Sequence, residues 1–303
     1  MLSILPLNPK LIIAGSFLLS ILSGHTCYAH MTSLMTDSVN AKLLGMSKVV
    51  SDDCARRALQ KIDEDEGARW LQDSLYYCYS PLLSQPWILD SDVTVKPLYG
   101  NQEGAVVGYN PHKPGRPSHT YHTHMIANLR LILDVEVQAG NQSSSSYSAP
   151  GLWALLERLP KTHRPQFIRG DCDWGSDGIM TEAEQREMDY LFKLRQSKYV
   201  KKLILDNHCK SGWEQTVEGW EALSSELKLS TWKRTRRVVI VRRRIKNNLV
   251  IAPDTDKAFP RQLSLLEPAE DMGIFEYSVL VTSLDAGVTT IVQHYRDRAD
   301  CEN

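Results

Sequence analysis

The sequence of 303 residues lacks the features that identify several large classes of protein. Its six cysteines form no C-x2-C pair and no regular framework, which favours reduced thiols over a zinc site or a disulfide scaffold. It has no internal repeat, no phosphate-binding glycine loop and no Ser/His/Asp arrangement. With a net charge of −1, the sequence lacks the excess of basic residues found in many DNA-binding domains. These absences leave a globular protein of ordinary composition, large enough for one sizeable core.

The sequence also lacks a long hydrophobic run. Residues 11–22 are apolar, but a transmembrane helix needs about 20 such residues. The segment is followed by Cys27, Tyr28 and Ala29, so residues 1–29 imitate a secretory signal with a small-residue cleavage site. We predict instead a buried helix of a cytoplasmic protein, and we keep export through residues 1–29 as an alternative.

The rest of the chain shows two kinds of hydrophobic pattern, one before and one after about residue 85. Up to residue 80 the apolar residues recur at helical spacing, and Ser51 with two following acids is typical of a helix start. From residue 87, segments rich in β-branched and aromatic residues predict strands. The expected helices cover residues 41–46, 53–62, 67–77, 151–159, 181–188 and 287–302. The expected strands cover residues 87–95, 121–128, 129–138, 166–171, 190–195, 227–231, 236–245, 249–252 and 275–282.

The order of these elements predicts an α/β fold. Three strands, a helix, a strand, a helix and a strand follow one another between residues 87 and 195, which is the order of a ribonuclease-H-like mixed sheet with flanking helices. We therefore expect an N-terminal helical segment (1–85), a ribonuclease-H-like core (86–199), a β-rich insertion (200–286) and the start of a C-terminal helix (287–303).

Three acids have a setting that suits metal-dependent phosphodiester chemistry. Asp92 lies on the first expected strand, Asp171 ends the fourth, and Glu302 lies on the last helix. Carboxylate oxygens bind hard divalent cations, and two such ions about 3.5–4 Å apart activate the attacking oxygen and stabilise the leaving oxygen. Asp90 is an alternative for the first position because it points to the same strand face, and Asp173 is a weaker rival for the second.

Several motifs occur together in one order. Tyr295, Arg298 and Glu302 follow the spacing Y-x2-R-x3-E, which places them on one helix face. Upstream stand Tyr99-Gly-Asn-Gln-Glu-Gly104 and a Gly/Pro-rich block over residues 108–119. From about residue 11 onward the chain resembles the insertion-sequence DDE transposases with the Tyr-Arg-Glu-Lys signature, whose third catalytic acid is the glutamate.

The resemblance implies a function. It predicts a DNA transposase that hydrolyses and joins phosphodiesters at element ends, with Asp92, Asp171 and Glu302 holding two Mg²⁺ or Mn²⁺ ions. The expected partners are terminal inverted repeats, target DNA and a second copy in a homodimer, with no membrane. The signature's lysine would lie beyond Asn303, so we expect a copy truncated at both ends. The alternative is an inactive remnant that binds DNA non-specifically.

Other residues are candidates for DNA contact. The resemblance assigns Tyr295 and Arg298 to the DNA end. Loop cations and a basic run over residues 233–246 suit phosphate contacts: Lys113, Arg116, His119, Arg236, Arg237, Arg242 and Arg244. One of Trp213, Trp220 and Trp232 is a candidate to stack on an extruded base. His119, His122 and His124 offer a zinc site as an alternative, which we do not favour because no ligand beyond these three is evident.

Overall fold

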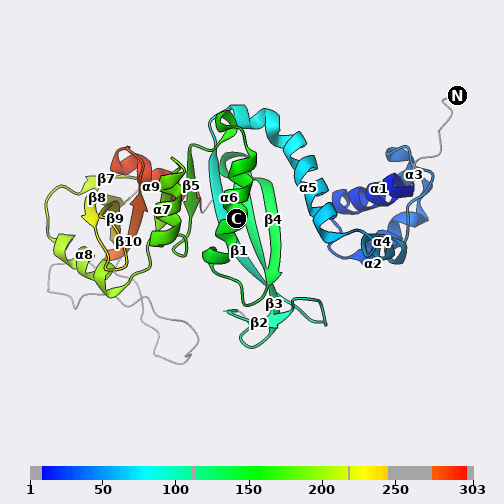
Figure 1. The fold of residues 1–303 in the computed structure, drawn as a ribbon, viewed down its shortest axis with the longest axis horizontal. Helices are drawn as coiled ribbons and strands as arrows, with labels where there is room; N and C mark the ends of the chain where they lie inside the picture. The colour runs from blue at the N-terminus through cyan, green and yellow to red at the C-terminus, as the bar shows by residue number, and fades with distance from the viewer. Residues whose placement is uncertain (1–8, 111–112, 218, 245–274, 299–303) are drawn as a thin grey trace. The chain divides into compact units, whose positions relative to one another are not determined.

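The computed structural model describes residues 9–110, 113–217, 219–244 and 275–298, in two compact units, Met1–Ser74 and Leu75–Asn303 (Figure 1). The boundary falls within helix α5 (Glu64–Tyr79). The first unit is helical, as predicted. Its other elements are α1 (Pro9–Leu22), α2 (Tyr28–Met31), η1 (Thr32–Thr36), α3 (Ser38–Leu43) and α4 (Asp52–Leu59).

Helix α1 packs by one face in the first unit. Ile12 and Leu19 are buried, and α1 contacts α2 and α4. Its opposite face, with Leu18 and Leu22, stays exposed, so the expected burial holds for one side. Ser51 caps α4 as predicted, since its Oγ accepts a hydrogen bond from the Cys54 backbone N–H at 3.3 Å. None of the helices that the structure describes combines the length and apolarity needed to cross a bilayer.

The second unit is built on one mixed sheet. Within the described residues, ten strands join it in the order β2-β3-β1-β5-β6-β10-β9-β8-β7, with β4 also paired to β3. Their bounds are β1 (Ile88–Pro97), β2 (Val106–Val107), β3 (Pro117–Ile126), β4 (Leu131–Ala139), β5 (Phe167–Gly170), β6 (Asp189–Lys193), β7 (Glu214–Gln215), β8 (Trp220–Leu227), β9 (Arg236–Arg244) and β10 (Phe275–Thr282).

The first five long strands confirm the expected fold. β4, β3 and β1 pair antiparallel, and β5 and β6 continue from β1 in parallel. This is the arrangement of a ribonuclease-H-like sheet, with short helices between the parallel strands. β10, β9, β8 and β7 then extend the same sheet beyond β6, all with antiparallel pairing.

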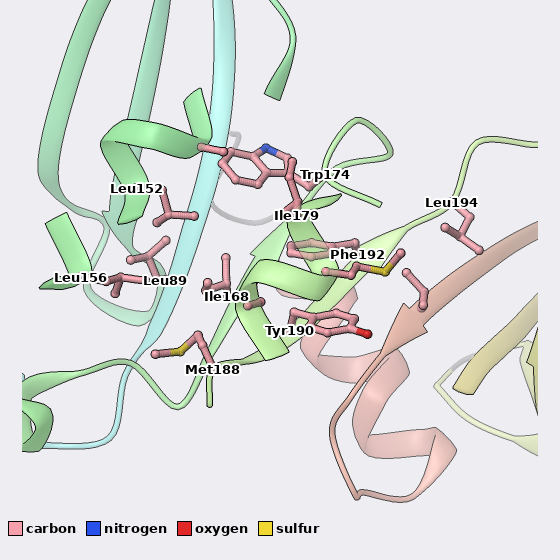
Figure 2. Close-up of a cluster of buried hydrophobic side chains, with 14 of the residues drawn as sticks. Leu89, Leu152, Leu156, Ile168, Trp174, Ile179, Met188, Tyr190, Phe192 and Leu194 are labelled. Atoms are coloured by element: carbon pink, nitrogen blue, oxygen red, sulfur yellow. The ribbon is translucent and has the colours of Figure 1, made fainter. Parts of the chain in front are cut away.

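Helices cover both faces of the sheet. On one face lie α6 (Ser145–Arg158), α7 (Asp177–Gln185) and α8 (Lys198–His208). Figure 2 shows Leu152 and Leu156 of α6 directed toward Leu89 of β1 and Ile168 of β5. On the other face α9 (Val288–Arg296) packs its apolar residues against β6, β8 and β9. Burying each such aliphatic side chain contributes roughly 1.5–3 kcal/mol, so α9 is firmly attached to its face.

Three expected elements differ from the structure. Helix α6 begins at Ser145, inside the expected serine-rich loop, and continues through Pro150. Helix α8 occupies the start of the region expected to be β-rich. The strand expected over residues 227–231 is wrong, because β8 ends at Leu227. The expected strand over residues 249–252 lies outside the described residues.

Candidate active site

Two of the predicted acids lie at neighbouring positions, where the parallel pairing of β1 with β5 ends. The parallel register pairs Ser91 with Gly170, and the next residues are Asp92, in the middle of β1, and Asp171, directly after β5. Equivalent positions on neighbouring parallel strands point to the same face. The side chain of Asp92 is 41% exposed, so its carboxylate is open to solvent. The structure therefore places Asp92 and Asp171 together on the face that carries α9.

Asp90 also points to this face, but its carboxylate is occupied. It is buried, and the guanidinium of Arg169 donates to both of its oxygens at 2.5 and 2.6 Å. A carboxylate that is buried and doubly bonded to arginine has little capacity left for a cation. Of the two alternatives for the first acid, the geometry favours Asp92.

Asp173, the rival for the second position, is similarly engaged. Its side chain accepts from Arg195 at 2.6 Å and from the Ser145 backbone N–H at 2.5 Å. It thereby anchors the start of α6. Its backbone N–H donates to Asp171 Oδ1 at 2.9 Å, which fixes the turn after β5. The structure thus gives Asp173 a structural role and leaves Asp171 as the accessible acid.

The end of α9 reaches the same acids. Arg298, just beyond the helix, donates from Nη2 to Asp92 Oδ1 at 3.1 Å. Tyr295 lies three residues earlier and half-buried, beside Leu280 and Val292. Of the predicted tyrosine–arginine stripe, Arg298 therefore contacts the first aspartate, and Tyr295 lines the same cavity as Arg298. Glu302, the predicted third acid, lies outside the described residues.

A cavity of about 300 Å³ opens on this face between α9 and the strands β6, β8, β9 and β10. Three cations and three aromatic residues contribute to its walls: Lys193, Arg296, Arg298, Trp220, Tyr277 and Tyr295. Lys193 follows Phe192, which pairs with Gly170, so it comes next to Asp171 on the sheet. Sequence patterns missed Lys193; the only available signal was a cation directly after an apolar strand parallel to β5.

The described part of the Gly/Pro-rich block leads into β3, which begins at Pro117. The Arg116 guanidinium lies over the Tyr99 ring, 4.2 Å from its centroid, and Lys113 contacts the Tyr99 hydroxyl. That contact lowers the pKa of Tyr99. His119 pairs with Lys96, an even number of residues from Asp92, so both lie on the face of the acids. Its Nε2 is 2.6 Å from the Glu103 carbonyl oxygen.

The basic run on β9 is used mainly inside the protein. Arg236 is buried and donates to Asp177 at 2.6 Å and to Glu184 at 2.9 Å on α7. Arg237 donates to the carbonyls of Leu284 and Ala286. Arg242 donates to Glu221 at 2.6 Å.

These partners correct the expectation that the whole run contacts DNA. Alternate side chains of a strand point to opposite faces, so a run of charges on a central strand sends part of its guanidiniums inward. Arg236, Arg237 and Arg242 therefore have structural roles. Arg244 is exposed at the end of β9.

The histidines do not form a metal site. His122 and His124 are buried on the face of α6, whereas His119 lies on the opposite face. His124 Nδ1 is 2.9 Å from Ser91 Oγ, and burial lowers its pKa to about 4. No group of three His, Cys, Asp or Glu side chains gathers around a metal position within the described ranges. The zinc interpretation is therefore wrong for these three histidines.

The acids do fit hard divalent cations. Asp92 and Asp171 supply carboxylate oxygens on adjacent strands, and Arg169 already neutralises the neighbouring Asp90. Oxygen donors of this kind suit Mg²⁺ and Mn²⁺ rather than softer metals. Two protein carboxylates leave further positions to waters and substrate oxygens, as Mg²⁺ sites do.

Solved structures with similarity to this chain include transposases. A cryo-EM structure of the piggyBac transposase synaptic complex with hairpin DNA is 13% identical, with a TM-score of 0.45, and the match covers 96% of this chain and 57% of that one. A crystal structure of the Mos1 strand transfer complex is 11% identical, with a TM-score of 0.24, covering 63% and 59%. The chain thus spans less than two thirds of either protein. No curated protein matches the sequence.

The family comparison covers almost the whole chain. The family model described as transposase DDE domain group 1 matches residues 10–303. The match includes β1 and β5, which carry Asp92 and Asp171, and all of α9. The chain belongs to the DDE transposase family.

Proposed function

We propose that this chain is the catalytic domain of a transposase that breaks and joins DNA at the ends of a mobile element. Water first attacks a phosphodiester at the element end, and the freed 3′-hydroxyl then attacks target DNA. The observation that carries the proposal is that Asp92 on β1 and Asp171 directly after β5 both follow the last pair of the parallel β1–β5 register, with Arg298, just beyond α9, bonded to Asp92.

Members of this family use divalent metal ions. In our proposal Asp92 and Asp171 hold two Mg²⁺ or Mn²⁺ ions, with Glu302 as the third carboxylate. When bound, such ions activate the attacking oxygen and stabilise the leaving oxygen. The protein's part is to present carboxylates in fixed positions and to hold the DNA strand so that its scissile phosphate lies between them.

Cations around the acids are positioned to hold that strand. Lys193 and Arg298 line the cavity beside the two aspartates, and Tyr295 adds a hydroxyl. We propose that these groups bind phosphates next to the scissile bond, because charge-assisted bonds to phosphate fix a strand without reading its sequence. Trp220 lines the same cavity and is the candidate to stack on a base that leaves the duplex.

A second contact surface consists of Tyr99, Lys113 and Arg116, which lie between β1 and β3, and of His119 on β3. It continues from β1 and β3, the strands that carry Asp92 and its neighbours. We propose that it binds the DNA backbone away from the scissile bond. The proposed DNA partners are the inverted repeats of the element and the target DNA. We propose that a homodimer in the cytoplasm binds both.

A nicking assay tests the proposed activity. The substrate is a supercoiled plasmid carrying the DNA that flanks this coding sequence, incubated with Mg²⁺ or Mn²⁺ and with EDTA as a blank. We expect metal-dependent nicking that falls on the order of 100-fold or more in Asp92→Asn and Asp171→Asn. Asp206→Asn, an exposed change on α8, is the matched control.

The possible results separate the hypotheses. Unchanged nicking by Asp171→Asn contradicts the assignment of the site. Salt-sensitive DNA binding without any metal-dependent nicking favours a DNA-binding protein without catalysis.

A further inference from the structure

Arg169 is a charged residue in an apolar setting. It is 1% exposed, on β5, and its neighbours on the same face include Phe167, Leu191 and Ile291. A charge in such a place is costly unless it is paired and hydrogen-bonded. The residue therefore needs an explanation beyond filling space.

All three nitrogens of the Arg169 guanidinium have partners. Nε and Nη2 donate to the two oxygens of Asp90 on β1, at 2.5 and 2.6 Å. Nη1 donates to the backbone carbonyl of His294 on α9. One planar group thus joins β1, β5 and α9, in a fork geometry that lysine cannot reproduce.

The hydrogen bond from Arg169 to His294 lies in the last turn of α9, close to the residues that reach the site. The last carbonyls of a helix have no partner within it, and the positive charge of Arg169 is favourable at this helix end. His294 precedes Tyr295 directly and Arg298 by four residues. Apolar contacts of Val288, Ile291 and Val292 attach α9 to the sheet, but such contacts are not directional. The hydrogen bond to His294 is directional and fixes the end of the helix along and around its axis.

Stability alone does not require this arrangement. A buried ion pair is often no more stabilising than well-packed apolar residues of similar volume. We propose that Arg169, held by Asp90, is a positioning residue. It sets the end of α9 against β1 and β5, so that Tyr295 and Arg298 stand at a fixed distance from Asp92 and Asp171. The catalytic consequence rests on the proposed function, whereas the positioning itself does not.

The chain provides a matched control. Arg236 is also a buried arginine on a strand, and its guanidinium joins β9 to Asp177 and Glu184 of α7 on the opposite face. Arg236→Lys therefore removes the same kind of fork from a different helix. Arg169→Lys keeps the positive charge beside Asp90 while losing the bidentate geometry.

Hydrogen exchange of the full chain, without DNA or metal, tests the proposal. In Arg169→Lys we expect the amides of residues 291–298 to exchange at least about tenfold faster, with α7 unchanged. In Arg236→Lys we expect the reverse. Equal exchange of α9 in both variants, or faster exchange spread over all strands, would overturn the proposal.

A double variant separates the effect of Arg169 on the position of α9 from the effect of leaving one buried charge unpaired. Arg169→Met with Asp90→Leu removes both charges and leaves an apolar pair, so the fold is retained even if single variants fail to fold. We expect the end of α9 to exchange faster in this protein as well. Wild-type exchange there would show that the guanidinium does not position the helix.

Nicking kinetics separate a positioning role of Arg169 from a simple loss of stability, because they measure the rate at saturating DNA and the DNA affinity separately. At saturating DNA, we expect Arg169→Lys to lower the nicking rate at least about tenfold, while the DNA dissociation constant rises less than in Arg298→Gln, because Arg298 is displaced but not removed. Arg236→Lys changes neither. If the wild-type protein nicks no DNA, the proposed function fails, but the exchange result still decides the role of Arg169.

Discussion

The ion pair between Arg298 and Asp92 places a guanidinium where a cation would approach the first acid. Arg298 Nη2 is 3.1 Å from Asp92 Oδ1, and a divalent ion bound to Asp92 has to share or displace that contact. A phosphate of bound DNA offers Arg298 another anionic partner. Binding of metal and binding of DNA at this site are therefore expected to support each other.

Replacing Arg298 tests this coupling. In Arg298→Gln the repulsion between guanidinium and metal disappears, so Mn²⁺ affinity without DNA rises, by about three- to tenfold. DNA affinity falls because a phosphate contact is lost. Mn²⁺ binding is measured by electron paramagnetic resonance and DNA binding by fluorescence anisotropy.

The matched variant is Arg296→Gln, which removes a cation of the same cavity. Because the ion pair between Arg298 and Asp92 is retained, we expect this change not to raise Mn²⁺ affinity. A fall of both affinities in Arg298→Gln would instead indicate simple damage to the site.

On strand β3, buried His124 couples stability to acid. Burial lowers its pKa from 6.5 to about 4, with a smaller contribution from His122. The unfolded chain therefore binds more protons between these values, and stability is lost as pH falls from about 6.5 to about 4. The loss from this group amounts to about 3 kcal/mol.

Urea unfolding at several pH values measures the effect. Wild type minus His124→Met isolates the contribution of His124, since the other groups titrate in both proteins. We expect the free energies of unfolding of the two proteins to converge toward pH 4. A difference that stays constant from pH 7 to pH 4 would contradict the assigned pKa.

Close backbone approach explains Gly108, at the start of the Gly/Pro-rich block. A Cβ added to Gly108 would lie 1.9 Å from the Gly140 carbonyl oxygen and 2.6 Å from Asn141 Cα. Because these are backbone atoms, relief requires moving the end of β4. We expect Gly108→Ala to destabilise the protein by roughly 1–3 kcal/mol or more. Gly178→Ala on α7, with nothing within 4 Å of the added atom, should stabilise it by about 0.5–1 kcal/mol. Thermal unfolding of both variants checks the contrast.

Local patterns predicted most elements because their signals are local. Alternation and β-branched residues identified β1, β3, β4 and β10, and a serine cap identified the start of α4. The start of α6 was missed because a distant residue fixes it. The Ser145 backbone N–H donates to Asp173, 28 residues later in the chain. That bond satisfies the first turn within a serine-rich segment that local rules assign to a loop.

Parts of the site depend on register, which sequence does not reveal. The two aspartates were recognisable because Asp92 lies within a predicted strand and Asp171 ends another. Lys193 joins them only through the pairing of β5 with β6, and Arg236 leaves the expected DNA surface only because β9 is a central strand. The occupation of Asp90 by Arg169 likewise follows from two strands lying adjacent. Cross-strand neighbours of this kind emerge from tertiary structure alone.

Charge over the full chain has a consequence for DNA binding. A net charge of −1 gives little long-range attraction to DNA, so affinity has to come from a few placed cations. The cations that we propose as phosphate contacts beside the acids and in the loop are Lys193, Arg298, Lys113 and Arg116. A plot of the logarithm of the DNA binding constant against the logarithm of the salt concentration should be linear. Four phosphate contacts predict a slope of about −3 to −4 for this plot.

Single charge removals test this count. Lys193→Ala should reduce the magnitude of the slope by about one, because one fewer phosphate is neutralised. Lys202 is exposed on α8, which lies on the opposite face of the sheet. Lys202→Ala changes the net charge by the same amount as Lys193→Ala but should leave the slope unchanged. Fluorescence anisotropy with a DNA duplex between about 50 and 200 mM salt measures both. Equal slopes in the two variants would mean that net charge, rather than the cavity beside the aspartates, determines how this protein holds DNA.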